Sequence, residues 1–296
     1  MRPVTVEGEP LVTIVLPTYN GARYVDEAIA SWVAQRHAAW ELVAVDDAST
    51  DDTPARLRAW RERDRRIRVL RHADNRALPA ALNTGFAAAR GVYFTWASDD
   101  NVAYPDALAE MVAFLEARPD VDLVYTDYAL IDERGRRVGK VEVPEPRALL
   151  DRNCVGASFL YRRALAERVG RYAEDLVLAE DYDFWLRAAV SGTLAPLSRE
   201  LHGYRMHGEA LAARFPVENR RAADRALGRH LARLPWPEER RERAERFLGL
   251  ALRELGRRDP ARAAHHAARA LARDPALVLG YAARRIAGRR GAEAHR

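Results

Sequence analysis

Three clusters of polar and acidic residues each follow a short apolar run in the first hundred residues. The run at 11–16 leads into PTYNG at 17–21, that at 41–45 into DDASTD at 46–51, and that at 92–96 into SDDN at 98–101. Carboxylates gathered at one place repel one another unless a cation or a donor-rich ligand neutralises them. Adjacent carboxylates such as Asp99 and Asp100 suit Mg²⁺ or Mn²⁺, which prefer oxygen ligands and often bind substrate phosphates as well.

A further acidic pair, Glu180 and Asp181, stands at the start of a helical pattern over residues 181–190. A positioned carboxylate can take the proton of a hydroxyl nucleophile, although an acidic pair at this place could also only stabilise the start of a helix. The chain has no GxxxxGK[ST] loop to cradle phosphate and no GxGxxG after the first apolar run. We therefore expect a metal ion to hold any phosphate, and a nicotinamide cofactor is disfavoured.

The elements that must position these residues alternate between strands and helices. Apolar runs predict strands at 11–16, 41–45, 66–70, 92–96 and 121–125, and a further strand is expected near 157–161. Helical spacing covers 24–35, 79–89 and 105–117, and residues 51–54 are typical of a helix start. This alternation predicts a mostly parallel sheet whose ligands bind outside the carboxyl ends of the strands. We expect Pro17 to end the first strand.

Composition fits a soluble globular protein with one large α/β domain and a smaller appendage. Of 296 residues, 48% are hydrophobic and 31% charged. The single cysteine, Cys154, excludes an intramolecular disulfide framework and a zinc site built on a cysteine cluster. No apolar run approaches the ~20 residues needed to span a bilayer, and the N-terminal residues lack the pattern of a signal peptide. We expect a cytoplasmic protein.

Positive charge is concentrated in the last part of the chain. Residues 216–296 hold 20 Lys and Arg against 10 Asp and Glu, whereas the net charge of the whole chain is +5. Codon bias toward arginine and alanine explains this simply, but a basic tail also favours anionic partners. From Pro216 onward the sequence is rich in alanine and arginine and has helical patterns. The Asp-Pro pairs at 259–260 and 274–275 suit helix starts. We place a domain boundary near residue 216.

The ordered motifs resemble the nucleotide-sugar-binding half of glycosyltransferase family 2, which has the GT-A fold. The segments that carry the likeness are VTIVLPTYN, ELVAVDDASTDDT and ALNTGFAAARGVYFTWASDDNVAYPDAL, and the likeness covers about residues 10–210. It implies an α/β, GT-A-like, Rossmann-type sheet flanked by helices, followed by an all-α C-terminal appendage. It also implies an inverting transferase that moves a sugar from a nucleotide diphosphate donor, expected to be a UDP-sugar, to an acceptor hydroxyl.

The resemblance assigns roles in nucleotide binding to residues after the first two strands. Pro17 and Tyr19 would flank the base, Asn20 lies in the same nucleotide-binding loop, and Asp47 would accept a hydrogen bond from a ring N–H of the base. Arg76 stands where glycine is usual in the family, and it could either reach the diphosphate or cover the rim of the site.

The resemblance also assigns metal ligands. Asp99 and Asp100 match the metal-binding carboxylates, and Asp99 also belongs to the nucleotide site. Mn²⁺ or Mg²⁺ is the implied cofactor, although Ala97 stands where many members have an extra aspartate. His207, in the segment YRMH at 204–207, is a weaker third ligand.

The acceptor half is similar to the family in the segments VGASFLYRR at 155–163 and LAEDYDFWLR at 178–187. Asp181 matches the aspartate that serves the family as catalytic base. The resemblance thus divides residues 1–215 into a nucleotide-sugar half at about 10–125 and an acceptor half at about 126–215.

His202 is a still weaker metal candidate than His207. The remaining histidines, among them His72, are interpreted as lying in helices or the tail without a role.

Residues 247–273 resemble one tetratricopeptide-like helical hairpin. One such unit cannot bury its own apolar face, so it should pack on the catalytic domain or on a second copy of the chain, giving a homodimer. Peripheral contact of the basic tail with a membrane is the rival use, and a nucleic acid partner is not expected. The alternative function is a non-catalytic sugar-nucleotide-binding scaffold with a partner-binding tail, but a scaffold has no need of the carboxylates at 47, 99, 100 and 181.

Overall fold

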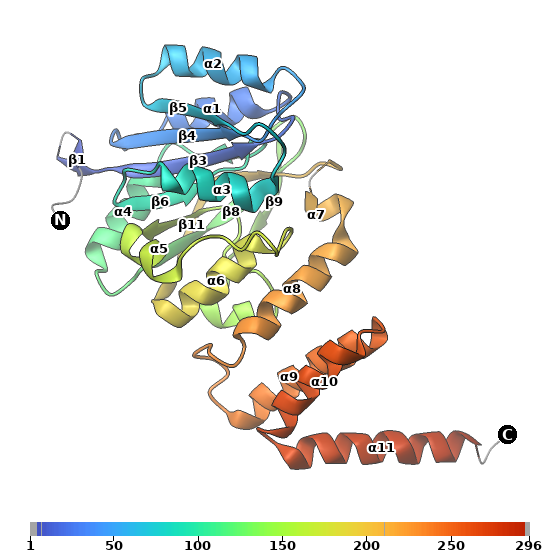
Figure 1. The fold of residues 1–296 in the computed structure, drawn as a ribbon. Helices are drawn as coiled ribbons and strands as arrows, with labels where there is room; N and C mark the ends of the chain where they lie inside the picture. The colour runs from blue at the N-terminus through green and yellow to red at the C-terminus, as the bar shows by residue number, and fades with distance from the viewer. Residues whose placement is uncertain (1–4, 7, 210, 294–296) are drawn as a thin grey trace. The chain divides into compact units, whose positions relative to one another are not determined.

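The chain divides into two compact units, Met1–Ala223 and Asp224–Arg296, in a computed structural model that describes residues 5–6, 8–209 and 211–293 (Figure 1). The first unit is α/β and the second is helical. The division lies inside helix α8 (Pro216–His230), which begins at the residue where the sequence changes its composition.

A nine-stranded sheet forms the centre of the first unit, in the order β5-β4-β3-β6-β10-β8-β11-β7, with β9 paired to β8. Strands β3, β4, β5 and β6 are parallel, as the alternation of strands and helices predicts, and β8 is parallel to β11. Strand β10 lies antiparallel between β6 and β8. The bounds are β3 Val12–Thr18, β4 Trp40–Asp46, β5 Ile67–Arg71, β6 Tyr93–Trp96, β7 Val102–Ala103, β8 Leu123–Ile131, β9 Arg137–Val141, β10 Phe159–Arg162 and β11 Leu194–Arg205. A separate pair joins β1 (Thr5–Val6) to β2 (Glu9–Pro10).

Helices cover both faces of the parallel strands, which explains why β3 and β4 are buried along their whole length. Val12, Ile14 and Leu16 of β3 share a buried core with α1 and α4. Val15 points to the other face, where α3 approaches so closely that a Cβ at Gly85 would lie 2.3 Å from Val15 Cγ1. The helices of this half are α1 Val25–Val33, α2 Thr53–Arg63, α3 Ala77–Ala87 and α4 Ala107–Ala117 (Figure 1).

The second half of this unit packs an aromatic core under helix α6 (Glu180–Ser191), close to the predicted helix over 181–190. Phe184 stacks on Tyr172 at 4.5 Å between ring centroids, and Trp185 meets Phe159 of β10 at 4.6 Å. These contacts fix the first turn of α6, which carries Asp181. The other helices here are the 3₁₀ helix η1 Pro146–Leu150, α5 Arg163–Val169 and α7 Leu211–Arg214.

The prediction that Pro17 ends the first strand is wrong, because β3 continues through Pro17 to Thr18. The Val12 N–H donates to the carbonyl of Ala39, on the side of β3 that faces β4. Because the backbone nitrogens of successive residues in a strand point to alternate sides, the nitrogen of Pro17 faces β6. Pairing between β3 and β6 ends at Val15 and Trp96. The missing N–H of Pro17 therefore costs no ladder hydrogen bond.

The second unit consists of the end of α8 with α9 (Arg240–Gly256), α10 (Pro260–Leu271) and α11 (Pro275–Glu293). Helices α10 and α11 begin at the prolines of the two Asp-Pro pairs, as predicted, and Asp259 caps α10 by accepting from the Arg262 N–H at 3.0 Å. Buried Asp224 accepts hydrogen bonds from Arg253 and Arg257, which ties α8 to α9. No helix within the described part of the chain is both long enough and apolar enough to cross a membrane.

Candidate functional site

The carboxyl ends of β3, β4 and β6 lie at one edge of the sheet because these strands are parallel neighbours. The loops after β3 and β4 are bonded to each other there. Asn20 N–H donates to Ser49 Oγ at 2.9 Å, and Thr50 N–H donates to Asn20 Oδ1 at 2.8 Å. Asn20 has φ 55°, a left-handed conformation that asparagine tolerates better than most residues. The side chain of the neighbouring Tyr19 is half exposed at this edge.

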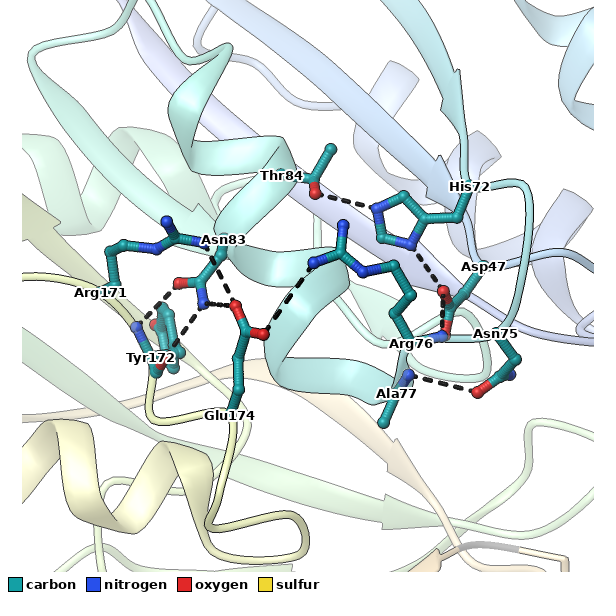
Figure 2. A network of polar contacts seen from close by, with 10 residues as sticks. All are labelled: Asp47, His72, Asn75, Arg76, Ala77, Asn83, Thr84, Arg171, Tyr172 and Glu174. Atoms are coloured by element: carbon teal, nitrogen blue, oxygen red, sulfur yellow. Dashed lines mark hydrogen bonds and ion pairs between the residues drawn. The ribbon is translucent and has the colours of Figure 1, made fainter.

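Asp47 lies immediately after β4, and its buried carboxylate is held from two directions (Figure 2). The backbone N–H of Arg76 donates to both oxygens, at 2.9 Å to Oδ1 and 3.1 Å to Oδ2. His72 Nδ1 lies 2.6 Å from Oδ1, and its Nε2 lies 2.9 Å from Thr84 Oγ1 on α3. The interpretation of His72 as a helical residue is wrong, since His72 directly follows β5. Its side chain contacts Asp47, the candidate base-binding residue.

The side chain of Arg76 lies at the start of α3 with its guanidinium 4.0 Å from Glu174 (Figure 2). Glu174 also accepts from Asn83 at 3.0 Å. The same Asn83 exchanges two hydrogen bonds with the backbone of Tyr172. This network joins α3 of the first half to the segment that leads into α6, and it directs Arg76 toward that segment.

Asp99 follows β6 and turns toward the first loop. Thr18 Oγ1 donates to Asp99 Oδ2, and a Cβ at Gly21 would lie 2.0 Å from the same oxygen, so only glycine fits beside it. Burial, followed by the charge of Asp100, raises the pKa of Asp99 to about 7. The position two residues earlier is filled by buried Ala97, which adds no carboxylate.

Asp100 faces a different neighbour, His207, which follows the end of β11. Asp100 Oδ2 lies 2.9 Å from His207 Nε2, while His207 Nδ1 is buried without a hydrogen-bond partner among the described residues. Fully buried Arg205 fixes the loop that carries Asp100. Its side-chain Nε donates to the Asp100 carbonyl at 2.7 Å, and its backbone N–H donates to Asn101 Oδ1 at 2.9 Å. The Arg205 guanidinium also packs over the ring of Tyr24.

The pair formed by Asp100 and His207 fits two ligands of a divalent metal ion. An octahedral ion with ligands at about 2.1 Å separates neighbouring ligand atoms by about 3.0 Å, close to the 2.9 Å between the two side-chain atoms. Within the described ranges, no group of three or more His, Cys, Asp or Glu side chains is arranged to hold a metal. A metal bound here would therefore take its other ligands from water and phosphate oxygens.

His202, the weaker metal candidate, lies apart from this pair. It is buried within β11 opposite Ala103 of β7, with its ring 6.3 Å from that of Trp32. Burial lowers the pKa of His202 to about 4.

Pro17 is buried inside β3 rather than in a loop, so Tyr19 is the exposed member of the pair expected to flank a base.

Asp181 lies in the first turn of α6 and accepts two hydrogen bonds. Asn153 Nδ2 donates to its Oδ2 at 2.7 Å, and the Tyr182 N–H donates to its Oδ1 at 2.6 Å. Burial raises the pKa of Asp181, while burial and the Asp181 charge raise the pKa of Glu180 to about 8. Within this pair, the charge of Asp181 favours the protonated form of Glu180.

Tyr204 connects the two acidic sites electrostatically. Burial raises the pKa of Tyr204, and the charges of Asp100 and Asp181 add to that rise. Both carboxylates therefore lie within electrostatic range of one phenol. Sequence patterns did not single out Tyr204, Asn153 or Arg205, although Tyr204 and Arg205 lie in the segment that contains His207.

Comparisons with known proteins agree with this architecture. The family model described as Glycosyl transferase family 2 matches residues 13–170. The O-antigen biosynthesis protein RfbC of Myxococcus xanthus is 33% identical over 231 residues, which cover 76% of this chain and 18% of that protein. Matches to three other curated relatives cover 26%, 58% and 31% of their lengths, so this chain spans less than two thirds of each.

Two solved structures share the fold. S. aureus TarS 1–349 in complex with UDP has a TM-score of 0.62 at 20% identity, covering 83% of this chain and 72% of that chain. The mannosyltransferase PcManGT from Pyrobaculum calidifontis, in complex with GDP-Man and Mn²⁺, has a TM-score of 0.61 at 23% identity, covering 94% and 80%. The predicted GT-A fold is thereby confirmed.

Proposed function

Because this chain belongs to glycosyltransferase family 2, we propose that it transfers a glycosyl group, with inversion, from a nucleoside diphosphate sugar to an acceptor hydroxyl. The observation that carries the proposal is the environment of Asp181, whose carboxylate accepts hydrogen bonds from Asn153 and the Tyr182 N–H and lies in electrostatic range of the same tyrosine as Asp100. The family supports the reaction class, and this arrangement supports the assignment of a base close to a cation site. The likeness to an O-antigen biosynthesis protein supports a saccharide acceptor.

The donor would bind across the edge formed by the loops after β3, β4 and β6. Asp47 would accept the ring N–H of the base, with Tyr19 against the base and Asn20 and Asp99 near the ribose. TarS has been solved with UDP and with UDP-GlcNAc, and PcManGT with GDP-Man, which supports a nucleotide sugar here. A UDP-sugar is the donor we propose.

Asp100 and His207 would hold Mn²⁺ or Mg²⁺ beside the diphosphate. A bound ion supplies positive charge that stabilises the departing diphosphate. The Mn²⁺ in the PcManGT complex supports this assignment. Arg205 holds the Asp100 loop against the end of β11 and so keeps the two ligands together.

Asp181 would act as the general base. As the acceptor oxygen forms its bond to the anomeric carbon, the bond from that carbon to the diphosphate oxygen breaks, and the hydroxyl proton passes to Asp181 Oδ1 or Oδ2. Attack from the face opposite the leaving group inverts the anomeric centre. Asn153 and the Tyr182 N–H hold the carboxylate in place for this transfer.

Asp181→Asn and Glu180→Gln together test the base. Asparagine cannot accept the proton, so nucleoside diphosphate release from a panel of nucleotide sugars with Mn²⁺ and water as acceptor should fall by roughly 10²–10⁴. Glutamine mimics a protonated Glu180, so that variant should keep release within about threefold. Both variants should bind UDP as wild type does. Equal losses in the two variants would assign the charge of the pair to Glu180 and refute the proposed base.

Asp100→Ala tests the metal site. Without this carboxylate, Mn²⁺ should no longer raise the thermal protection given by UDP, while the melting temperature without ligands stays close to that of wild type. Asp106→Ala is the control, because it removes a partly exposed carboxylate that pairs only with Arg36 at the surface among the contacts described. If Asp100→Ala keeps its response to Mn²⁺, the metal is held elsewhere.

A further inference from the structure

The Asp47 carboxylate has little acceptor capacity left for a ligand. An ionised carboxylate offers about four lone-pair positions, two on each oxygen. Oδ1 is 2.6 Å from His72 Nδ1 and 2.9 Å from the Arg76 N–H, which fills both of its positions. Oδ2 shares the same Arg76 N–H at 3.1 Å, so it keeps one position for another donor.

His72 is itself fixed, so Oδ1 stays occupied. The imidazole is buried, and Thr84 on α3 holds its second nitrogen at 2.9 Å. Because an ionised carboxylate only accepts hydrogen bonds, Nδ1 must be the donor to Asp47 in either charge state of the ring. Oδ1 of Asp47 therefore cannot turn to a nucleobase without breaking the contact with His72.

We propose that His72 and the peptide N–H of Arg76 select the nucleobase of the donor, by limiting Asp47 to one donated hydrogen bond. The site then takes a base of the uracil type, which offers a single ring N–H, and rejects guanine. This inference rests on the proposed function, in which Asp47 receives the base, and it makes His72 a positioning residue that determines specificity.

The hydrogen-bonding edges of the bases explain the selection. Uracil and thymine present one N–H between two carbonyl groups, which matches the single free position on Oδ2. Guanine presents a ring N–H and an amino group side by side, so that its full recognition by a carboxylate uses both oxygens. With Oδ1 filled, the guanine amino group is left unpaired, and an unpaired buried donor weakens binding by about 10- to 100-fold. Cytosine and adenine turn an unprotonated ring nitrogen to the carboxylate and are repelled.

The test is calorimetric titration of the whole chain with UDP, dTDP, GDP, CDP and ADP in the presence of Mn²⁺. We expect UDP and dTDP to bind at least tenfold more tightly than the other three. The ratio of UDP to dTDP affinity reports on the ribose 2′-hydroxyl and the 5-methyl group, because the hydrogen-bonding edges of the two bases are the same. GDP binding as tight as UDP binding overturns the inference. Failure of all five nucleotides to bind overturns the proposed function itself, which keeps the two failures distinct.

Substitution of His72 separates selection from simple stability. His72→Leu frees Oδ1, so the preference for UDP over GDP should shrink to about threefold or less. His72→Asn places an amide N–H near the position of Nδ1 and should restore a preference of at least tenfold. A merely structural role would lower the affinity for all nucleotides alike and leave their ratio unchanged, which overturns the inference.

Thr84→Val provides a second route if His72→Leu does not fold. It leaves the imidazole in place but removes the partner of Nε2, so the ring no longer holds one orientation against Asp47. The ratio of UDP to GDP affinity should then fall between those of wild type and His72→Leu. An unchanged ratio in Thr84→Val, with His72→Leu unfolded, counts against selection by His72.

Discussion

Arg205→Met should destabilise the first unit by about 3–5 kcal/mol, because it removes a fully buried guanidinium that donates to three backbone carbonyls. Arg205 is 1% exposed and donates to the carbonyls of Asp100, Asp132 and Glu133 at 2.7, 3.2 and 3.1 Å. Each abandoned carbonyl costs about 1 kcal/mol or more. The fourth partner, Glu27, has a side chain that is 52% exposed and can return to water at little cost.

Thermal and urea unfolding of the first unit, followed by tryptophan fluorescence, measure this change. For a unit of this size, about 3–5 kcal/mol corresponds to a fall in melting temperature of roughly 10 °C. Arg137→Met is the matched control, since it removes an exposed ion pair with Glu200 and should leave the stability close to that of wild type. Mn²⁺-dependent UDP binding should also weaken in Arg205→Met but not in the control. A stability loss below about 1 kcal/mol in Arg205→Met refutes the reasoning.

Three further changes have defined outcomes. Gly21→Ala should abolish Mn²⁺-dependent nucleotide binding by displacing Asp99, whereas Gly208→Ala, which meets no atom within 4 Å, should not, as titration with UDP will show. The buried His202 imidazole has a pKa of about 4 when folded and an ordinary value near 6.5 when unfolded, so protons favour the unfolded chain below pH 6.5. Stability should fall by roughly 2–3 kcal/mol between pH 7 and 4.5, and urea titrations of His202→Leu should lack this part of the fall. Asp224→Ala leaves two arginines without their buried partner and should lower the stability of the helical unit by about 3 kcal/mol, measured by circular dichroism.

The parallel half of the fold could be predicted because its signals are local. Each apolar run is continuous where a strand is covered on both faces, and each helix carries its own periodicity. The convergence of Asp47 and Asp99 at one sheet edge then follows from parallel pairing of neighbouring strands. The rule does not say which side chains these carboxylates contact, namely His72 for Asp47 and Thr18 for Asp99.

The contacts that were missed join residues far apart in the chain. Asn153 reaches Asp181 from a loop, and Arg205 reaches Asp100 across more than a hundred residues, so no periodicity records either pair. His72 could have been found, since it follows the predicted strand at 66–70 and the strand-end rule that selected Asp47 applies equally to it. The continuation of β3 through Pro17 depends on where β6 stops, which is a tertiary fact.

The antiparallel strand β10 has a consequence for the order in which the chain can fold. Tyr161 of β10 pairs with Phe94 of β6, so the parallel strands keep an open hydrogen-bonding edge at β6 until a segment much later in the sequence arrives. A non-local pairing of this kind slows folding, and an uncovered edge invites association with other chains. A fragment that stops after β8 would therefore hold Asp47, Asp99 and Asp100 yet remain prone to aggregate during synthesis. Strand β10 thus acts as an intramolecular cap on β6, and the strands on its two sides depend on each other in folding.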